Sequence, residues 1–209
     1  MKVKSRVIRR TSFIVASLVL LLAIHATAQE VRSEISLQGT GFFTKDSTGQ
    51  GNLQRSTDTG GFLVGYRYHF NRWLSAEGVY GYDRNTQQFF SNASVSRVQA
   101  NVHQATGGLV INLPSPRFLR ANPYVLAEGG ALVFDPTNNN FGSVPGAQRQ
   151  TTGVFVYGGG ADFPILRHVS LRAEYRGLVY SAPDFGLRNL NTNAITHTAQ
   201  PSAGIVFRF

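Results

Sequence analysis

The chain has 209 residues, with 20 lysines and arginines against 11 acidic residues and no cysteine. This length suits one domain, and the lack of cysteine excludes a disulfide scaffold and thiolate metal sites. The formal charge of +9 invites a nucleic-acid interpretation, but beyond the N-terminal segment the arginines are scattered and form no basic platform, so we predict no nucleic-acid partner.

Residues 1–28 are predicted to be a cleaved signal peptide. A basic segment with Lys2, Lys4, Arg6, Arg9 and Arg10 precedes an apolar run over 13–24, and Ala26-Thr27-Ala28 supplies a cleavage pattern. The alternative, an N-terminal membrane anchor, is disfavoured because the run is too short to span about 30 Å of hydrocarbon as a helix. Removal of this segment leaves 15 basic and 11 acidic residues from Gln29 onward.

Residues 29–209 are predicted to form one domain of eight strands, because period-two alternation recurs between polar stretches rich in Gly and Asn. The segments lie at approximately 31–43, 59–70, 72–83, 97–113, 122–134, 151–163, 168–180 and 197–209. Long connections (44–58, 84–96, 135–150, 181–196) alternate with short ones (71, 114–120, 164–167). This alternation is typical of an up-and-down barrel whose two termini lie at the short-turn rim.

The apolar face of these strands is predicted to meet lipid. In the first segment Ile35, Leu37 and Phe43 alternate with Glu34 and Gln38. An eight-stranded barrel has an interior only wide enough for side chains, and aromatic residues such as Phe62, Tyr66, Tyr68, Phe70, Tyr80 and Tyr82 would overfill it. Strands of about 10 residues fit a tilted membrane crossing. We therefore predict an all-β, eight-stranded antiparallel transmembrane barrel in a bacterial outer membrane.

Aromatic residues near the segment ends are predicted to form girdles at the two membrane interfaces. They are Phe43, Phe70, Tyr82, Tyr124, Phe134, Phe163 and Tyr180.

The fourth segment leaves two alternatives open. Leu109 and Ile111 share a parity with Gln99, Asn101 and His103. Its outer half therefore either leaves the membrane or contains a bulge.

Several short motifs resemble the outer membrane protein A-type and opacity-type family of eight-stranded barrels. They are Gly158 to Phe163 followed by Ser170 to Arg176, Gly65 to Tyr68 with Glu77 to Tyr82, and Pro123 to Val125. The C-terminus, with Gly204, Phe207 and Phe209, is similar to the family's insertion signal, which implies recognition by the barrel-assembly machinery. Larger family members carry a peptidoglycan-binding domain after the barrel, and this chain stops at Phe209.

The opposite strand faces carry charges that are predicted to form an ion network in the lumen. Counted from the periplasmic strand ends, a carboxylate layer falls between guanidinium layers, with Glu34 near the lower arginines. Buried charges persist only when they are paired. The hypothesis is that this network plugs the lumen and fixes strand register. Its predicted members are Glu34, Arg67, Glu77, Glu128, Arg172, Glu174 and Arg176.

A catalytic alternative is weaker. Some small outer-membrane barrels modify lipids with a serine, a histidine and an acid, and here His197 and Ser202 lie five residues apart, on opposite faces of one strand. A nucleophile and its base must reach hydrogen-bonding distance. The lumen carboxylates and His69 are the other catalytic candidates. His103 lacks an accompanying serine motif, and the Gly158–Gly160 run lies within a strand. We predict no enzyme activity, no cofactor and no metal.

The sequence leaves two functions open. The first is a structural or porin-like envelope protein with a charge-plugged, narrow lumen and four polar surface loops. The second is an adhesin or recognition protein that reaches an extracellular partner through those loops, since loops on a rigid scaffold often bind. Outer-membrane lipid and lipopolysaccharide are the expected surroundings.

Overall fold

The computed structural model describes residues 32–49, 52–91, 94–115, 120–137, 144, 146–187 and 190–209. The predicted signal peptide lies outside these residues. Within the described ranges, no helix is both long and apolar enough to cross a bilayer.

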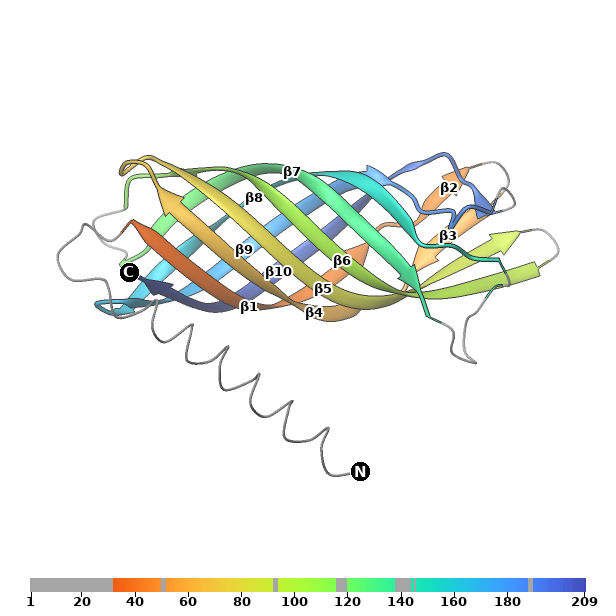
Figure 1. Ribbon diagram of the computed structural model, residues 1–209, viewed down its shortest axis with the longest axis horizontal. Coiled ribbons are helices and arrows are strands. Elements are labelled where there is room, and N and C mark those ends of the chain that lie inside the picture. Colours follow the sequence, from red (N-terminus) through yellow and green to blue (C-terminus); the bar gives the residue numbers. More distant parts are fainter. Residues whose placement is uncertain are drawn as a thin grey trace, which may run out of the picture.

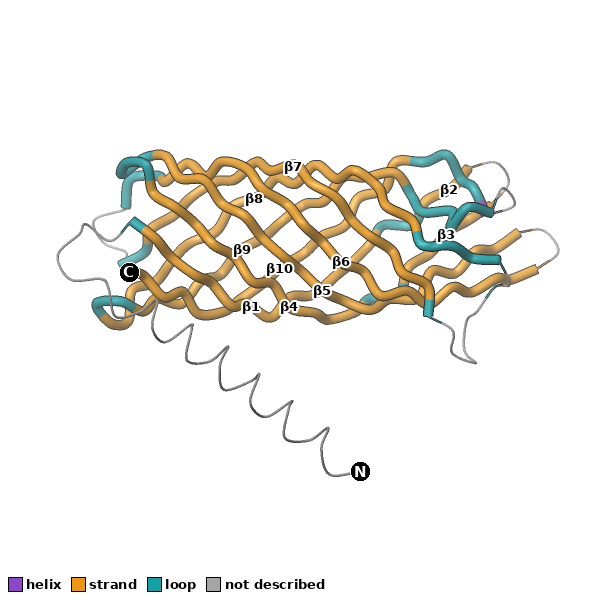
Figure 2. Tube along the Cα trace, viewed as in Figure 1, coloured by secondary structure: helices purple, strands orange, loops and turns teal. Residues whose placement is uncertain are grey.

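Eight antiparallel strands form a closed barrel (Figures 1 and 2), which confirms the predicted fold class. The cylinder closes because the last strand pairs with the first, from Glu34 opposite Arg208 to Thr44 opposite Thr198. In order around the barrel the strands are β1 (Ser33–Thr44), β4 (Thr59–His69), β5 (Leu74–Ser91), β6 (Ser94–Asn112), β7 (Asn122–Pro136), β8 (Gln150–Leu166), β9 (Val169–Ser181) and β10 (Ile195–Arg208).

Both ends of the described chain lie at one rim, which we call the periplasmic rim. Ser33 and Phe209 exchange backbone hydrogen bonds of 3.1 and 2.9 Å. The connections at 70–73 and 167–168 and the described parts of the β6–β7 connection (113–115 and 120–121) lie at this rim, on the left in Figure 1. Pro164 was expected in the last of these, but β8 continues through it to Leu166 with a register shift against β9.

The predicted long connection at 84–96 is wrong, because β5 and β6 continue through most of it. A short hairpin that was not predicted, β2 (Ser47–Gly49) and β3 (Asn52–Ser56), pairs with the outer part of β5 from Leu53 opposite Phe90 to Ser56 opposite Gln87. Residues 84–96 are rich in Asn, Gln and Ser and so resemble a loop in sequence. Because the outer part of β5 pairs with β3, the sheet continues beyond the barrel (Figure 1).

The register of β6 settles the alternatives left open for the fourth segment. Strand β6 pairs with β5 from Leu74 opposite Ile111 to Ser91 opposite Ser94 without a shift, so the bulge alternative is wrong. The His103 ring faces outward and its Nδ1 lies 2.8 Å from the Tyr80 hydroxyl. With 19 residues, β6 exceeds the roughly 9–11 that a tilted strand needs to cross the hydrocarbon. Its polar outer part therefore extends past the apolar band.

The strand faces are inverted relative to a soluble barrel. Leu37, Phe155 and Ile205 point outward and are 57%, 53% and 43% exposed, whereas Arg67 and Arg172 point inward and are 1% exposed. Exposed apolar side chains from every barrel strand together make a band far larger than the patches that monomeric soluble proteins tolerate. This inversion is the arrangement that a hydrocarbon environment requires.

The predicted aromatic girdles are only partly correct. Phe43, Phe70 and Phe163 are exposed on the outer surface, as expected. Tyr124, Phe134 and Tyr180, in contrast, are at most 3% exposed and point into the lumen. Tyr124 and Phe134 share the parity of Glu128 on β7, and parity rather than nearness to a strand end decides which face a side chain occupies.

Candidate functional site

The lumen is filled by two kinds of side chain, one in each half. The half toward the periplasmic rim holds an ion network of four arginines and five carboxylates. Its members are Glu34, Arg67, Glu77, Glu128, Asp162, Arg172, Glu174, Arg176 and Arg208. The half toward the long connections is mainly apolar, with a polar strip along β1, β5 and β10.

Arg172 is the centre of the ion network. Its Nε and Nη2 donate to the Asp162 carboxylate at 2.7 and 2.9 Å, and Nη2 also donates to Glu34 at 2.5 Å. Its Nη1 donates to Glu77 at 3.3 Å. Strands β5 and β9 lie on opposite sides of the eight-strand ring. The Arg172–Glu77 contact therefore joins opposite walls directly.

Arg67 and Arg176 extend the network on either side of this centre. Arg67 donates to Glu77 at 2.8 Å and lies 3.4 Å from Glu34. Arg176 donates to Glu128 and, at 3.2 Å, to Glu174. Because these charges are taken out of water, each remains favourable only while its partners stay in place.

Tyr124 links the arginines to the carboxylates through its ring and its hydroxyl. The Arg67 guanidinium lies 4.2 Å from the ring centroid, and the hydroxyl donates to Glu174 at 2.6 Å. A Cβ added at Gly160 would lie 2.7 Å from the Tyr124 hydroxyl and 2.5 Å from the Ala173 carbonyl oxygen. Glycine at this position therefore makes room for the tyrosine.

A layer of amides separates the ion network from the apolar half. Gln200 donates to Gln104 at 3.1 Å, which again joins opposite walls because β10 and β6 face each other across the ring. Beside this pair, the Ser202 hydroxyl donates to Gln38 at 2.9 Å.

The apolar half is closed by the connection between β9 and β10. Phe185 is fully buried and packs edge-on against Phe89 and Phe134, with ring centroids 6.4 Å apart in both pairs. Leu190, from the same connection, is 3% exposed. The expectation of four polar surface loops therefore fails here, because this connection contributes apolar side chains to the lumen.

Backbone hydrogen bonds hold this connection in place. The Gln150 side-chain oxygen accepts from the backbone N–H groups of Asp184 and Phe185 at 2.9 and 2.7 Å. Gln148 N–H donates to the Phe185 carbonyl at 2.9 Å. Phe185 adopts a φ of 54°, which is uncommon for a residue with a side chain. The interactions around Phe185 therefore hold its backbone in a strained conformation.

The structure brings together all seven residues that the sequence placed in the lumen network. It adds Asp162, Arg208 and Tyr124, which the sequence argument did not assign to it. Arg208 donates to Glu34 at 3.1 Å and to Asp162 at 2.7 Å. Parity alone could have found these residues, because Asp162 shares the face of Gly158 and Gly160 and Arg208 shares the face of Ser202.

The catalytic candidates do not meet. His197 faces outward, where Nε2 lies 2.8 Å from the Tyr157 hydroxyl, and Ser202 faces into the lumen. His69 lies 3.3 Å from Glu34, at the lower edge of the ion network. Among the described residues, no group of three or more His, Asp or Glu is arranged to hold a metal ion.

The residues of the expected insertion signal occupy the end of β10. Phe207 and Phe209 are 51% and 40% exposed, and Gly204 faces the lumen. A Cβ at Gly204 would lie 2.0 Å from the Leu37 carbonyl oxygen, so the strands β1 and β10 approach too closely here for another residue.

A closed barrel with a lipid-facing apolar band and a charged, filled lumen defines a class: the small transmembrane β-barrels of the bacterial outer membrane. A family model for the outer membrane protein beta-barrel domain matches residues 14–209, and the chain belongs to this family. The predicted family and location are thereby confirmed. A search of curated proteins found no match.

Solved structures share the fold at low sequence identity. OprG from Pseudomonas aeruginosa is 13% identical with a TM-score of 0.57, over 87% of this chain and 98% of that one. The neisserial surface protein NspA is 15% identical with a TM-score of 0.54, over 84% and 97%. Ail from Yersinia pestis, in complex with the heparin analogue sucrose octasulfate, is 19% identical with a TM-score of 0.50, over 87% and 100%.

Proposed function

We propose that this outer-membrane barrel is a non-conducting structural protein of the envelope, with a lumen sealed at several levels. The observation that carries the proposal is the direct contact of opposite walls, Arg172 with Glu77 and Gln200 with Gln104. An ion crossing the barrel would have to break buried, charge-assisted hydrogen bonds, which are the stronger kind. The apolar half, closed by Phe185, adds a second barrier.

Planar-bilayer recordings test this proposal. We expect no steady open current from the mature chain, and none from a variant in which residues 184–191 are replaced by a short glycine-serine linker. The second result is expected because the ion network remains when the outer closure is removed. Arg55→Gln serves as the control, since Arg55 pairs with Asp46 on the exposed outer hairpin. Large, steady open currents from the unmodified protein would contradict the proposal.

A recognition role is the second candidate, and the outer extension favours it. Strands β2, β3 and the outer parts of β5 and β6 form a hydrogen-bonded sheet beyond the barrel. Deleting residues 88–97 would shorten this extension and leave the ion network untouched. Loss of cell or matrix adhesion in the deletion, with a normal folding-dependent gel shift, would support recognition. Unchanged adhesion would count against it.

We propose a non-enzymatic role, because His197 and Ser202 point to opposite faces of β10. Incubation with phospholipid and lipid A is expected to give no product. Turnover that disappears in His197→Ala would overturn this part of the proposal.

The C-terminal strand is proposed to be the insertion signal read by the barrel-assembly machinery. Phe209 is 40% exposed on the outer surface at the rim and lies outside the ion network, so its loss leaves the lumen contacts in place. Phe209→Ala is therefore expected to slow insertion several-fold while the folded barrel stays stable. Pulse-chase labelling with the gel shift measures the rate, and Phe155→Ala on the outer wall is the matched control. Normal insertion kinetics in Phe209→Ala would refute the assignment.

A further inference from the structure

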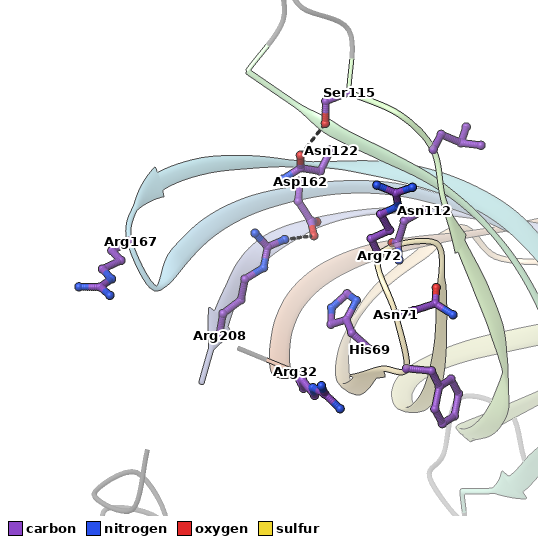
Figure 3. A pocket seen from close by; sticks show the side chains of 12 residues that line it. Arg32, His69, Asn71, Arg72, Asn112, Ser115, Asn122, Asp162, Arg167 and Arg208 are labelled. Carbon is purple, nitrogen blue, oxygen red and sulfur yellow. Dashed lines mark hydrogen bonds and ion pairs between the residues drawn. The ribbon is translucent and has the colours of Figure 1, made fainter. Parts of the chain in front are cut away.

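The mouth of the barrel at the periplasmic rim contains a cavity of about 560 Å³ (Figure 3). Ligand-binding cavities have volumes of roughly 300–1,000 Å³, so this one has the size of a small-molecule site. Its floor is the lower edge of the ion network, where His69 and Arg208 contact Glu34. Residues of the β4–β5, β6–β7 and β8–β9 connections contribute to its walls.

The charges around this cavity are unbalanced. The cavity is lined by Arg72, Arg167 and Arg208, among other residues. Of the described residues that line it, the acidic one is Asp162. Asp162 already accepts hydrogen bonds from Arg172 and Arg208. In the described parts of the three connections at this rim, the charged side chains are the arginines Arg72, Arg120 and Arg167. A cleft lined by one sign of charge concentrates counter-ions.

Amide donors complete the lining. The Asn71 oxygen accepts from the N–H groups of Trp73 and Leu74, which leaves its amide nitrogen to serve as a donor. The Asn122 oxygen accepts from Ser115. Figure 3 shows Asn71, Asn122 and Arg72 around the mouth, with Arg167 further out at the β8–β9 turn. Planar guanidinium groups bind phosphate oxygens through paired hydrogen bonds, and amide groups can add further ones.

We propose that this cavity, the periplasmic vestibule, is a binding site for a phosphate-bearing anion. The ligand is either a soluble phosphate ester or the headgroup of an anionic phospholipid from the surrounding leaflet. Arg72 and Arg167 supply the charge, and the asparagine amides orient the phosphate oxygens. The proposal is independent of whether the lumen conducts, because the vestibule lies below the ion network.

Titrations on the complete mature chain, refolded in dodecyl maltoside, test the site. Inorganic phosphate and glycerol 3-phosphate are added while the arginine Nε–H signals are followed by NMR. We expect saturable shifts for Arg72 and Arg167 but not for Arg55, which is on the exposed outer hairpin. Arg72→Gln combined with Arg167→Gln is expected to weaken phosphate binding at least tenfold, and Arg55→Gln to leave it unchanged. Neither vestibule arginine belongs to the ion network, so the double variant should still fold and show the gel shift.

Lipid nanodiscs separate the two sources. Saturable binding of the soluble anions in detergent, without preferential retention of phosphatidylglycerol in nanodiscs, indicates a soluble ligand. Retention of phosphatidylglycerol over phosphatidylcholine by native mass spectrometry, lost in the double variant, indicates a lipid headgroup. The proposal is overturned if neither probe binds, if acetate shifts the same signals as strongly as phosphate, or if Arg55→Gln weakens binding as much as the double variant.

Discussion

The two halves of the lumen fill the same cylinder with opposite chemistry. Toward the periplasmic rim the contacts are directional, since each arginine meets named carboxylate oxygens at fixed distances. Toward the outer rim, Leu178, Val156 and Phe134 pack without directional bonds. A one-residue slip of a strand would turn its inward residues outward and break the charged contacts. We propose that the ion network specifies the register and that the apolar half mainly fills space.

Two substitutions on strand β9, one in each half of the lumen, test this difference most strongly. Arg172→Met leaves Glu34, Asp162 and Glu77 without their shared partner and is expected to cost about 3–5 kcal/mol of unfolding free energy. Leu178→Met, six residues further along β9 on the same face, keeps volume and polarity and should cost less than about 1.5 kcal/mol. Urea unfolding in lipid vesicles, followed through the single tryptophan, Trp73, measures both. Equal losses would mean that the two halves do not differ as described.

The next largest loss of unfolding free energy is expected when the connection that closes the apolar half is weakened. Phe185→Ala removes a ring that packs against Phe89 and Phe134, and we expect a loss of about 3 kcal/mol, near the low end for a buried phenylalanine because a connection can partly collapse. Limited proteolysis should then cleave the connection between β9 and β10. Phe185→Leu, which retains most of the apolar volume, is the control. A connection that stays protected in Phe185→Ala would show that its backbone hydrogen bonds suffice.

Two glycines test how closely the ion network is packed. Gly160→Ala places a methyl group against Tyr124 and the Ala173 carbonyl, and we expect a loss of about 2–3 kcal/mol from this overpacking. A Cβ at Gly129, on the neighbouring strand β7, meets nothing within 4 Å, so Gly129→Ala should be nearly neutral. The two variants are compared by urea unfolding. Similar stability of both would argue that the lumen relaxes around the added methyl group.

The smallest effect concerns one hydroxyl. Tyr124→Phe removes the hydrogen bond to Glu174 but leaves the Arg176 contact to the same carboxylate. Hydrogen bonds to charged groups contribute about 1.5–3 kcal/mol, and the remaining partner places the expected loss at about 1.5 kcal/mol. In an Arg176→Met background the same substitution should cost more. A double-mutant cycle measures this coupling, and strict additivity would show that the two contacts act independently.

Most of the fold and much of the network follow from parity in the sequence. The alternation around Glu34, Arg67 and Arg172 was enough to place them in one lumen, because successive side chains of a strand point to opposite faces. Asp162 and Arg208 obey the same rule, since each lies on the lumen face of its strand, although neither is among the predicted members of the network.

Other features depend on contacts distant in the sequence. The outer parts of β5 and β6 have a loop-like composition, and the pairing of β5 with β3 becomes visible only in the structure. The burial of Phe185 depends on Phe89 and Phe134, which lie on strands far away in the chain. Aromatic residues at strand ends were assigned to interfaces by their position, although parity directs Tyr180 into the lumen.

The length of β6 has a practical consequence. At about 3.3 Å per residue, its 19 residues extend roughly 60 Å, and a tilt near 45° still leaves a rise of roughly 45 Å. The hydrocarbon core is only about 30 Å thick, so the paired ends of β5 and β6 at Ser91 and Ser94 extend beyond it. An epitope tag inserted there should be readable by antibody on intact cells, and this tip offers a natural position for displaying foreign peptides.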